Sequence, residues 1–410
     1  MATQLNSIPT LVESPFIIVK IGDVTFGSYT VQQEQGSIKV NYPNYMKSLT
    51  AVKVNGTVNT YTIQFTYQVR PGEDPNLLDK ILSKAANNRR LTIKYGDWNA
   101  PSYIYREEKA IITRVTSVLN LQSSAIDYTV SCQSDTLGIF STPFNFPARN
   151  TKPSDEIKRL LGVKKYGLQE AFPGMTNLSK VLSSNLIASN DKKVQLNAQR
   201  QVNVMTYLQY LVNSMVHQDT KSSGLSSSQY FLTIKDDYNN LYGGTYFKVE
   251  EVKVNTRNVN SIDTYEIDIN YPGDNFVTQF SINDDQSWSI LYEYSESIKQ
   301  EQLCYRIGND GHLIQNYAPS ISRSETTNNN SATKNAWWSK MTQFPIKATL
   351  TIKGLTRHSI LMSYVKLNVL FSGGLKHISS GLYIITKQTD TINSSGYKTT
   401  LELLRVGGDE

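Results

Sequence analysis

Residues 60–69 read Thr-Tyr-Thr-Ile-Gln-Phe-Thr-Tyr-Gln-Val, and they decide the fold class of this chain. Large apolar or aromatic side chains alternate with Thr and Gln at every second position, which is the pattern of a β-strand with one covered face. The Asn55-Gly56 pair just before them is a strong short-range signal for a β-hairpin. The alternation returns at residues 126–132, 265–271, 348–352 and 397–403. The sequence therefore predicts a mainly β protein with α+β parts.

Three segments carry the spacing of amphipathic helices instead. The first follows Asp74, which suits an N-cap, and Pro75, which suits the first helical position, and Asn87-Asn88 is predicted to end it. Ser154 is predicted to cap the second helix, and the third and most regular one covers residues 204–215. The predicted apolar faces are Leu77, Leu78, Ile81 and Leu82; Ile157, Leu160 and Leu161; and Val204, Tyr207, Leu208, Leu211, Val212 and Met215.

Composition limits the classes of protein that need consideration. The chain has 410 residues, of which 39% are hydrophobic and 19% charged, so two or three domains with real cores are expected. The net charge of +6 is spread along the chain, unlike the concentrated basic stripe of nucleic-acid-binding proteins. Cys132 and Cys304 alone do not make a disulfide framework. Without a signal-peptide pattern or a long apolar run, we expect no secretory leader and no membrane anchor.

The change of pattern along the chain predicts its division into parts. Residues 1–137 are expected to form a first β domain and residues 138–225 a helical connector. Residues 226–295 and 340–410 are expected to form a second β domain, interrupted by an insertion at 296–339. Within that insertion, the Thr/Asn/Ser-rich segment 318–335 has little to bury and predicts an exposed loop.

A search for catalytic constellations gives no convincing candidate. No metalloprotease, serine-hydrolase or phosphate-loop motif is present, and the four histidines, His217, His312, His358 and His377, are far apart in sequence. Two carboxylates can hydrolyse a glycosidic bond, and the candidate pairs are Glu107-Glu108, Asp236-Asp237 and Asp284-Asp285. Adjacent acids on a strand point to opposite faces, so one pair cannot supply both catalytic roles. The second pair precedes a predicted hairpin turn at residues 238–244, and the third lies in a turn-like stretch at residues 283–286, where such residues are common without any function. We therefore expect no enzyme, no catalytic residue, no cofactor and no bound metal.

Four strings, in this order along the chain, carry a resemblance to a known family. They cover residues 244–252, 271–294, 345–354 and 381–405, and the last contains Gly-Leu-Tyr-Ile-Ile and then Gly-Tyr-Lys-Thr-Thr-Leu-Glu-Leu-Leu-Arg. This closing pattern resembles the baseplate hub proteins of tailed bacteriophages and the related spike proteins of contractile injection systems. Near the N-terminus, Tyr-Pro-Asn-Tyr at 42–45 and Tyr-Gly-Asp at 95–97 look like the first tail-tube-like domain of such hubs.

The resemblance implies two tail-tube-like β-barrel domains and a structural role in the virion. Such hubs form homotrimers, so that six barrels match the hexameric tail tube protein on one side. A central spike or tail-tip protein and other baseplate proteins bind elsewhere, and tape-measure protein and DNA pass through the channel during DNA ejection. Synthesis in the host cytoplasm and no C-terminal hydrolase domain are expected. Gly381 and Gly396 are predicted at turns with positive φ, and the predicted core positions are Tyr383, Ile385, Leu401 and Leu403.

Two other classes of protein stay open at this point. A receptor-binding or carbohydrate-binding tail protein would fit the 25 Tyr residues, the Asn-rich loop and the Trp337-Trp338 pair. A peptidoglycan hydrolase is the third alternative, and the absence of its motifs argues against it.

Overall fold

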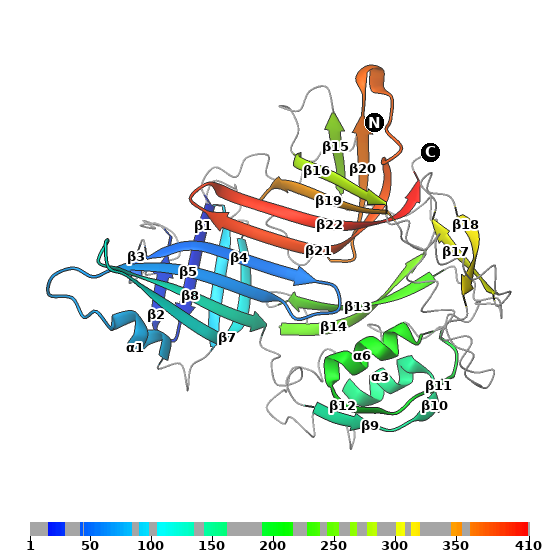
Figure 1. The fold of residues 1–410 in the computed structure, drawn as a ribbon, viewed down its shortest axis with the longest axis horizontal. Coiled ribbons are helices and arrows are strands. Elements are labelled where there is room, and N and C mark those ends of the chain that lie inside the picture. Colours follow the sequence, from blue (N-terminus) through cyan, green and yellow to red (C-terminus); the bar gives the residue numbers. More distant parts are fainter. Residues whose placement is uncertain are drawn as a thin grey trace.

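The computed structural model describes most of the chain, in fifteen segments. They are residues 15–28, 42–43, 45–83, 90–97, 105–134, 143–161, 191–215, 228–237, 244–253, 263–268, 277–284, 301–307, 313–319, 346–354 and 361–408. Strands dominate these segments, so the mainly β prediction is confirmed (Figure 1).

Fourteen strands form one sheet, and all but two of its pairings are antiparallel. The order along the sheet is β16 (Val277–Asp284), β19 (Ile346–Lys353), β22 (Gly396–Gly408), β21 (Gly381–Asn393), β4 (Met46–Val54), β5 (Thr60–Gln68), β8 (Ala125–Ser134), β7 (Tyr105–Asn120), β6 (Arg90–Asp97), β1 (Pro15–Ile21), β2 (Val24–Gly27) and β3 (Tyr42–Pro43). β20 (Tyr364–Leu370) branches from β21, and β15 (Asp263–Asp268) pairs with β20.

The N-terminal core forms as the alternation predicted. Tyr61, Ile63, Phe65 and Tyr67 of β5 are all buried, and they face the same core as Tyr128, Val130 and Cys132 of β8. Gly56 adopts a positive φ of 77° in the turn between β4 and β5, which explains the glycine there. Helix α1 (Leu77–Ser83) packs the predicted apolar face against this core, and its predicted end at residues 87–88 lies outside the described residues.

The C-terminal core is built from the strands that flank β21 and β22. Tyr383, Ile385, Leu401 and Leu403 are buried together, as predicted. Ala348, Leu350 and Ile352 of β19 and Tyr265 and Ile267 of β15 complete the same core. Gly381 and Gly396 have φ values of 156° and 117°, so both predictions of positive φ are confirmed. A Cβ at residue 381 would meet the backbone oxygen of Gly407 at 2.6 Å, which adds a steric reason for glycine.

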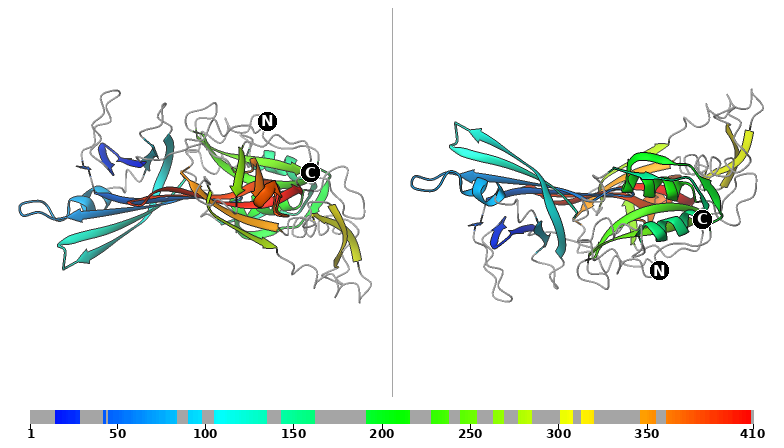
Figure 2. Two further views of the ribbon diagram at one scale, coloured as in Figure 1. Left: turned by 90° about the horizontal axis from the view of Figure 1, so that it is seen from above. Right: turned by 90° about the horizontal axis from the view of Figure 1, so that it is seen from below.

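The long β21–β22 hairpin belongs to both cores at once. The half of the hairpin away from its turn carries the C-terminal core residues on both strands. Ile392 and Tyr397, next to the turn, are buried in the N-terminal core. A β-bulge at Thr386 divides the two halves of β21, and beyond it β21 pairs with β4. Figure 2 shows this hairpin running from one part of the molecule into the other. The two predicted β domains therefore share one sheet, and their predicted boundaries and barrel closure stay predictions.

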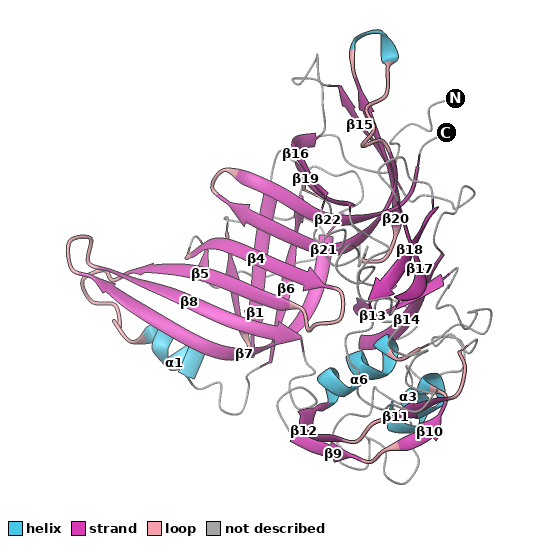
Figure 3. Ribbon diagram, turned by 45° about the vertical axis from the view of Figure 1, so that its right-hand side comes forward, coloured by secondary structure: helices cyan, strands magenta, loops and turns pink. Residues whose placement is uncertain are grey.

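A smaller helical unit lies beside the sheet (Figure 3). Helices α3 (Pro153–Leu161) and α6 (Val204–Asn213) share a core with strands β9 (Pro143–Phe146), β11 (Val194–Leu196) and β12 (Gln199–Asn203). Strand β10 (Arg149–Thr151) pairs with β11 at the edge of this unit. The predicted apolar face of α6 is confirmed, and Asn203 caps the helix by accepting a hydrogen bond from the Thr206 amide. The predicted cap at Ser154 is wrong, because α3 begins at Pro153 and the Ser154 hydroxyl donates to buried Asp191 instead.

Two hairpins complete the described structure. β13 (Ser228–Asp237) and β14 (Gly244–Lys253) pair with each other, and Tyr230, Leu232 and Val249 pack into the core of the helical unit. β17 (Glu301–Ile307) and β18 (Leu313–Pro319) form the other hairpin. The first two residues of the predicted 318–335 loop thus belong to β18, and the rest of that segment lies outside the described residues.

Candidate functional site

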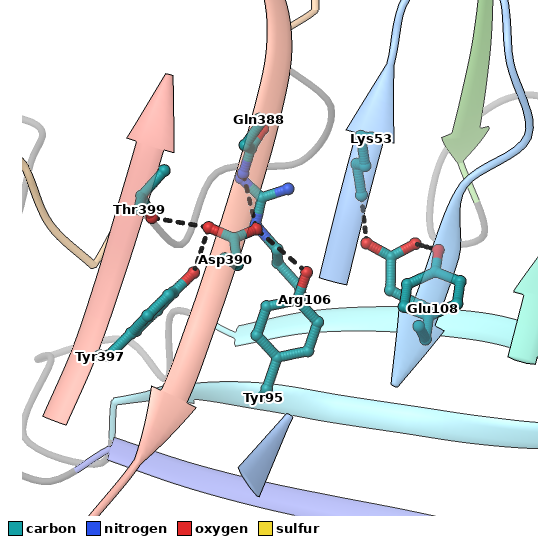
Figure 4. A network of polar contacts seen from close by, with 9 residues as sticks. Lys53, Tyr95, Arg106, Glu108, Gln388, Asp390, Tyr397 and Thr399 are labelled. Carbon is teal, nitrogen blue, oxygen red and sulfur yellow. Dashed lines mark hydrogen bonds and ion pairs between the residues drawn. The ribbon is translucent and has the colours of Figure 1, made fainter. Parts of the chain in front are cut away.

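A buried polar network lies where the β21–β22 hairpin enters the N-terminal part (Figure 4). Its centre is the Asp390 carboxylate on β21, which is 1% exposed. One carboxylate oxygen accepts hydrogen bonds from the hydroxyls of Thr399, at 2.6 Å, and Tyr397, at 3.2 Å. The other accepts from Gln388 Nε2, at 2.7 Å, and from the Tyr95 hydroxyl, at 3.3 Å. Four donors from three strands therefore converge on one side chain.

Arg106 on β7 supplies the positive charge that this buried carboxylate requires. Its Nε lies 3.9 Å from Asp390 Oδ2, and the whole side chain is inaccessible to solvent. Burial is the largest single influence on the pKa of Arg106 and would lower it, but the nearby acidic groups, Asp390 foremost, together outweigh burial and raise this pKa. The guanidinium therefore stays charged, and the ion pair joins β7 of the N-terminal part to β21 from the C-terminal end of the chain.

A second buried ion pair lies next to the first. Lys53 on β4 donates to Glu108 on β7, and the Tyr61 hydroxyl donates to the other oxygen of Glu108 at 3.2 Å. Both charged side chains are at most 2% exposed. Lys53 also stands opposite Gln388 in the β4–β21 register, so the two ion pairs follow the junction between these strands.

The side chains of this network are arranged to hold strands together. Burial, and then the charge of Asp390, raise the pKa of Tyr95 and Tyr397 well above their ordinary value, so both phenols stay protonated and act as donors. The Asp390 carboxylate already accepts four hydrogen bonds, which leaves no lone pair directed at a substrate. We infer from this geometry that the network fixes how the β21–β22 hairpin sits on the N-terminal part.

Five of the six acids in the candidate pairs lie in described strands, and Asp285 lies outside the described residues. Glu107 and Glu108 point to opposite faces of β7, as expected, and Glu107 pairs with Lys94 at 3.0 Å. Asp236 and Asp237 end strand β13, which pairs with β14 as a hairpin, in agreement with the turn predicted after this pair. The turn predicted at residues 283–286 is wrong for Asn283 and Asp284, which end strand β16.

Among the four histidines, His377 alone lies in the described segments. His377 shares a hydrogen bond of 2.6 Å with the Ser379 hydroxyl two residues away, which is a local turn contact. His217, His312, His358 and Trp337-Trp338 lie outside the described residues. Burial raises the pKa of the Cys132 thiol to about 12, so this cysteine is a buried apolar side chain rather than a nucleophile.

Within the described segments, no group of His, Cys, Asp and Glu side chains could hold a metal ion. None of the helices there is long and apolar enough to cross a membrane.

Two exposed apolar surfaces were missed by the sequence analysis. The first lies on the β7–β8 hairpin, where Val118, Leu119 and Leu121 are 59%, 70% and 91% exposed. The second is the loop between β20 and β21, where Phe371, Leu375 and Ile378 are exposed. The alternation rule assumes that every apolar strand face is covered, so it gave these residues no special meaning. Exposed apolar side chains that gather on one part of a structure make it a candidate binding surface.

Comparison with known proteins identifies the fold. No family model matches the chain, and no curated protein matches it by sequence. Two solved structures resemble it over nearly their whole length. The 43 kDa tail protein of prophage MuSo2 from Shewanella oneidensis has a TM-score of 0.53 at 11% identity, covering 96% of this chain and 97% of that chain. A tail protein from Neisseria meningitidis MC58 has a TM-score of 0.50 at 9% identity, covering 96% and 98%. The chain therefore has the fold of these tail proteins.

Proposed function

We propose that this chain is a non-enzymatic structural protein of a bacteriophage-type tail, and specifically a baseplate hub subunit at the end of the tail tube. The observation that carries the proposal is the likeness to two tail proteins across nearly the whole of all three chains. A likeness confined to one β domain would fit many unrelated proteins. The closing sequence pattern at residues 381–405 supports the narrower role of a hub.

The proposed assembly is a homotrimer around a central channel. Each copy contributes two tail-tube-like β units, residues 1–137 and residues 226–295 with 340–410, and the connector 138–225 and the insertion 296–339 lie outside them. Three copies then present six units to the hexameric tail tube protein, and the threefold side receives a spike or tail-tip protein. Tape-measure protein and DNA would pass through the channel. The buried network supports this assembly, because matching a regular hexamer requires the two units of each copy to hold one fixed orientation.

Copy number and position in the particle test the proposal. Cryo-electron microscopy of intact tails should find three copies on the tail axis, at the end of the tube. A larger number of copies at the periphery would instead establish the receptor-binding or carbohydrate-binding alternative. A cell-wall zymogram with the purified chain should show no cleared band, and a band would establish a hydrolase.

A further inference from the structure

The two hairpins that end each half of the sheet repeat one another in detail. Ile-Ile-Thr occurs at 111–113 in β7 and again at 384–386 in β21. The threonine of each copy forms a β-bulge, at Thr113 and at Thr386. Each threonine hydroxyl donates to the backbone oxygen across the bulge, to Ser131 at 3.0 Å and to Glu402 at 3.1 Å. β7–β8 and β21–β22 are therefore equivalent elements.

The other two strands of each half correspond as well. β4 pairs with β5 through a bulge between Met46 and Ser48, and β16 pairs with β19 through a bulge between Val277 and Gln279. The sheet accordingly reads β16-β19-β22-β21 and then β4-β5-β8-β7, which is the same set of four strands twice in the same direction. β20 and β6 occupy equivalent places, because each pairs with the first half of its long strand.

The repeat breaks at one place, and that place is the exposed apolar surface on β7. Beyond its bulge, β21 pairs with β4, the first strand of the following set. Beyond its own bulge, β7 pairs among the described residues only with β8. Leu119 is 70% exposed, whereas its equivalent on β21, Ile392, is 2% exposed. On β16, Ile282 is 38% exposed, whereas its equivalent on β4, Ala51, is fully buried.

We propose that the outer half of β7 pairs with β16 of a second copy of this chain, in the antiparallel register of the β21–β4 junction. That register sets Leu119 opposite Phe280, Ser117 opposite Ile282 and Val115 opposite Asp284 of the neighbour. The contact adds a strand at sheet edges that no other described strand pairs with, and it covers apolar side chains that are exposed in the single copy. The chain's own junction argues for this occupant, because it already joins the equivalent strands.

The same contact explains how copies would form a closed assembly. The two partners are different surfaces of the chain, and a head-to-tail contact of this kind generates a ring when its rotation closes. The expected number of copies in the ring, three, rests on the proposed function. The strand pairing between copies does not depend on that number.

A disulfide placed across the contact tests the register. In the chain's own junction the Asn55 amide donates to the Thr386 oxygen, and hydrogen-bonded and non-hydrogen-bonded pairs alternate from there. The equivalents of the non-hydrogen-bonded pair Thr391–Thr50 are Val118 and Ser281, whose Cα atoms should then lie about 4.5 Å apart between copies. A disulfide forms readily across that separation. Both residues are exposed, so changing them should leave the fold intact.

The experiment uses the full-length Val118→Cys, Ser281→Cys variant in a Cys304→Ser background. Within one copy the two sites are seven strands apart, or roughly 34 Å along the sheet, so a disulfide between them must join two copies. We expect mild oxidation to give a covalent trimer on a non-reducing gel. The matched control is Val118→Cys with Asn283→Cys, a diagonal pair about 7–8 Å apart, and it should stay largely monomeric on the gel.

The possible outcomes separate this inference from the proposed function. A trimer in solution without a 118–281 disulfide would overturn the strand pairing and leave the hub proposal standing. Covalent rings with a different number of copies would support the pairing and overturn the threefold hub. A protein that stays monomeric and forms no cross-link at high concentration would overturn the inference.

Discussion

Asp390→Asn should destabilise the protein far more than its position on a polar-looking stretch of sequence suggests. The substitution preserves the shape of the side chain and removes its charge. Arg106, which is fully buried, then loses the carboxylate that interacts most strongly with its positive charge. Removing one partner of a buried ion pair costs about 3–5 kcal/mol, because the other charge stays in a place that solvates it poorly.

The lower end of that range applies here, since the asparagine carbonyl can still accept one or two of the four hydrogen bonds. A loss of about 3 kcal/mol is a large share of the roughly 5–15 kcal/mol that stabilises a typical domain. With a urea dependence of about 1–3 kcal/mol per molar, it corresponds to a midpoint lowered by about 1–3 M.

Urea titration followed by circular dichroism measures this midpoint, and the chain offers a matched control. Asp127 accepts a hydrogen bond from Thr66 at 2.6 Å, the same distance as that from Thr399 to Asp390, but at an exposed site. Asp127→Asn should therefore change the free energy of unfolding by less than about 1 kcal/mol. Equal midpoints for the two variants would refute the claim that Asp390 holds the hairpin in place.

A double variant separates loss of the charge from loss of the residue. Arg106→Met combined with Asp390→Leu removes both charges and fills the same space with apolar groups. Replacing a complete buried ion pair in this way is often neutral or stabilising. The double variant should therefore be more stable than Asp390→Asn, despite carrying more changes. A double variant that is the least stable of the set would show that the hydrogen bonds of the carboxylate matter more than its charge.

Three other measurements follow from the same structure. Stability should fall as pH rises above about 10, because the unfolded chain loses the Tyr95 and Tyr397 protons there while the folded protein retains them; Tyr95→Phe should flatten that fall in urea midpoints. Ser117→Pro should abolish oligomers in size-exclusion chromatography with little change in melting temperature. The Ser117 equivalent on β21, Asp390, directs its amide toward β4, so the Ser117 amide should point toward the neighbouring copy, and proline is tolerated on an edge strand. Unchanged oligomers would refute the edge pairing. Leu401→Asp should yield no folded protein, because residue 401 is fully buried, whereas Leu401→Met should fold and melt cooperatively.

The strands and cores could be predicted because they depend on local patterns. Residues 60–69 alternate strictly, and every large side chain of that stretch in β5 is buried. The same rule located Leu401 and Leu403, since a period of two assigns a face without reference to the strand's neighbours. The cap at Ser154 failed because its partner, Asp191, is remote in sequence and competes for the hydroxyl that the local rule assigned to the helix end.

The buried polar network around Asp390 could not be predicted, because no local sequence pattern shows that these residues are buried together. The segment around Asp390 reads Lys-Gln-Thr-Asp-Thr-Ile-Asn, which resembles a solvated strand face. Its burial arises from pairing with β4, more than 300 residues away in the sequence. The repeated Ile-Ile-Thr is present in the sequence, but a match of three residues does not establish a structural repeat. The shared β-bulge and the shared threonine hydrogen bond show that the backbone repeats as well. Once the halves are known to be equivalent, their differences become informative. Beyond its bulge β21 pairs with β4, whereas the equivalent part of β7 has exposed apolar side chains. This difference is the basis for proposing that a second copy supplies the strand that pairs with β7.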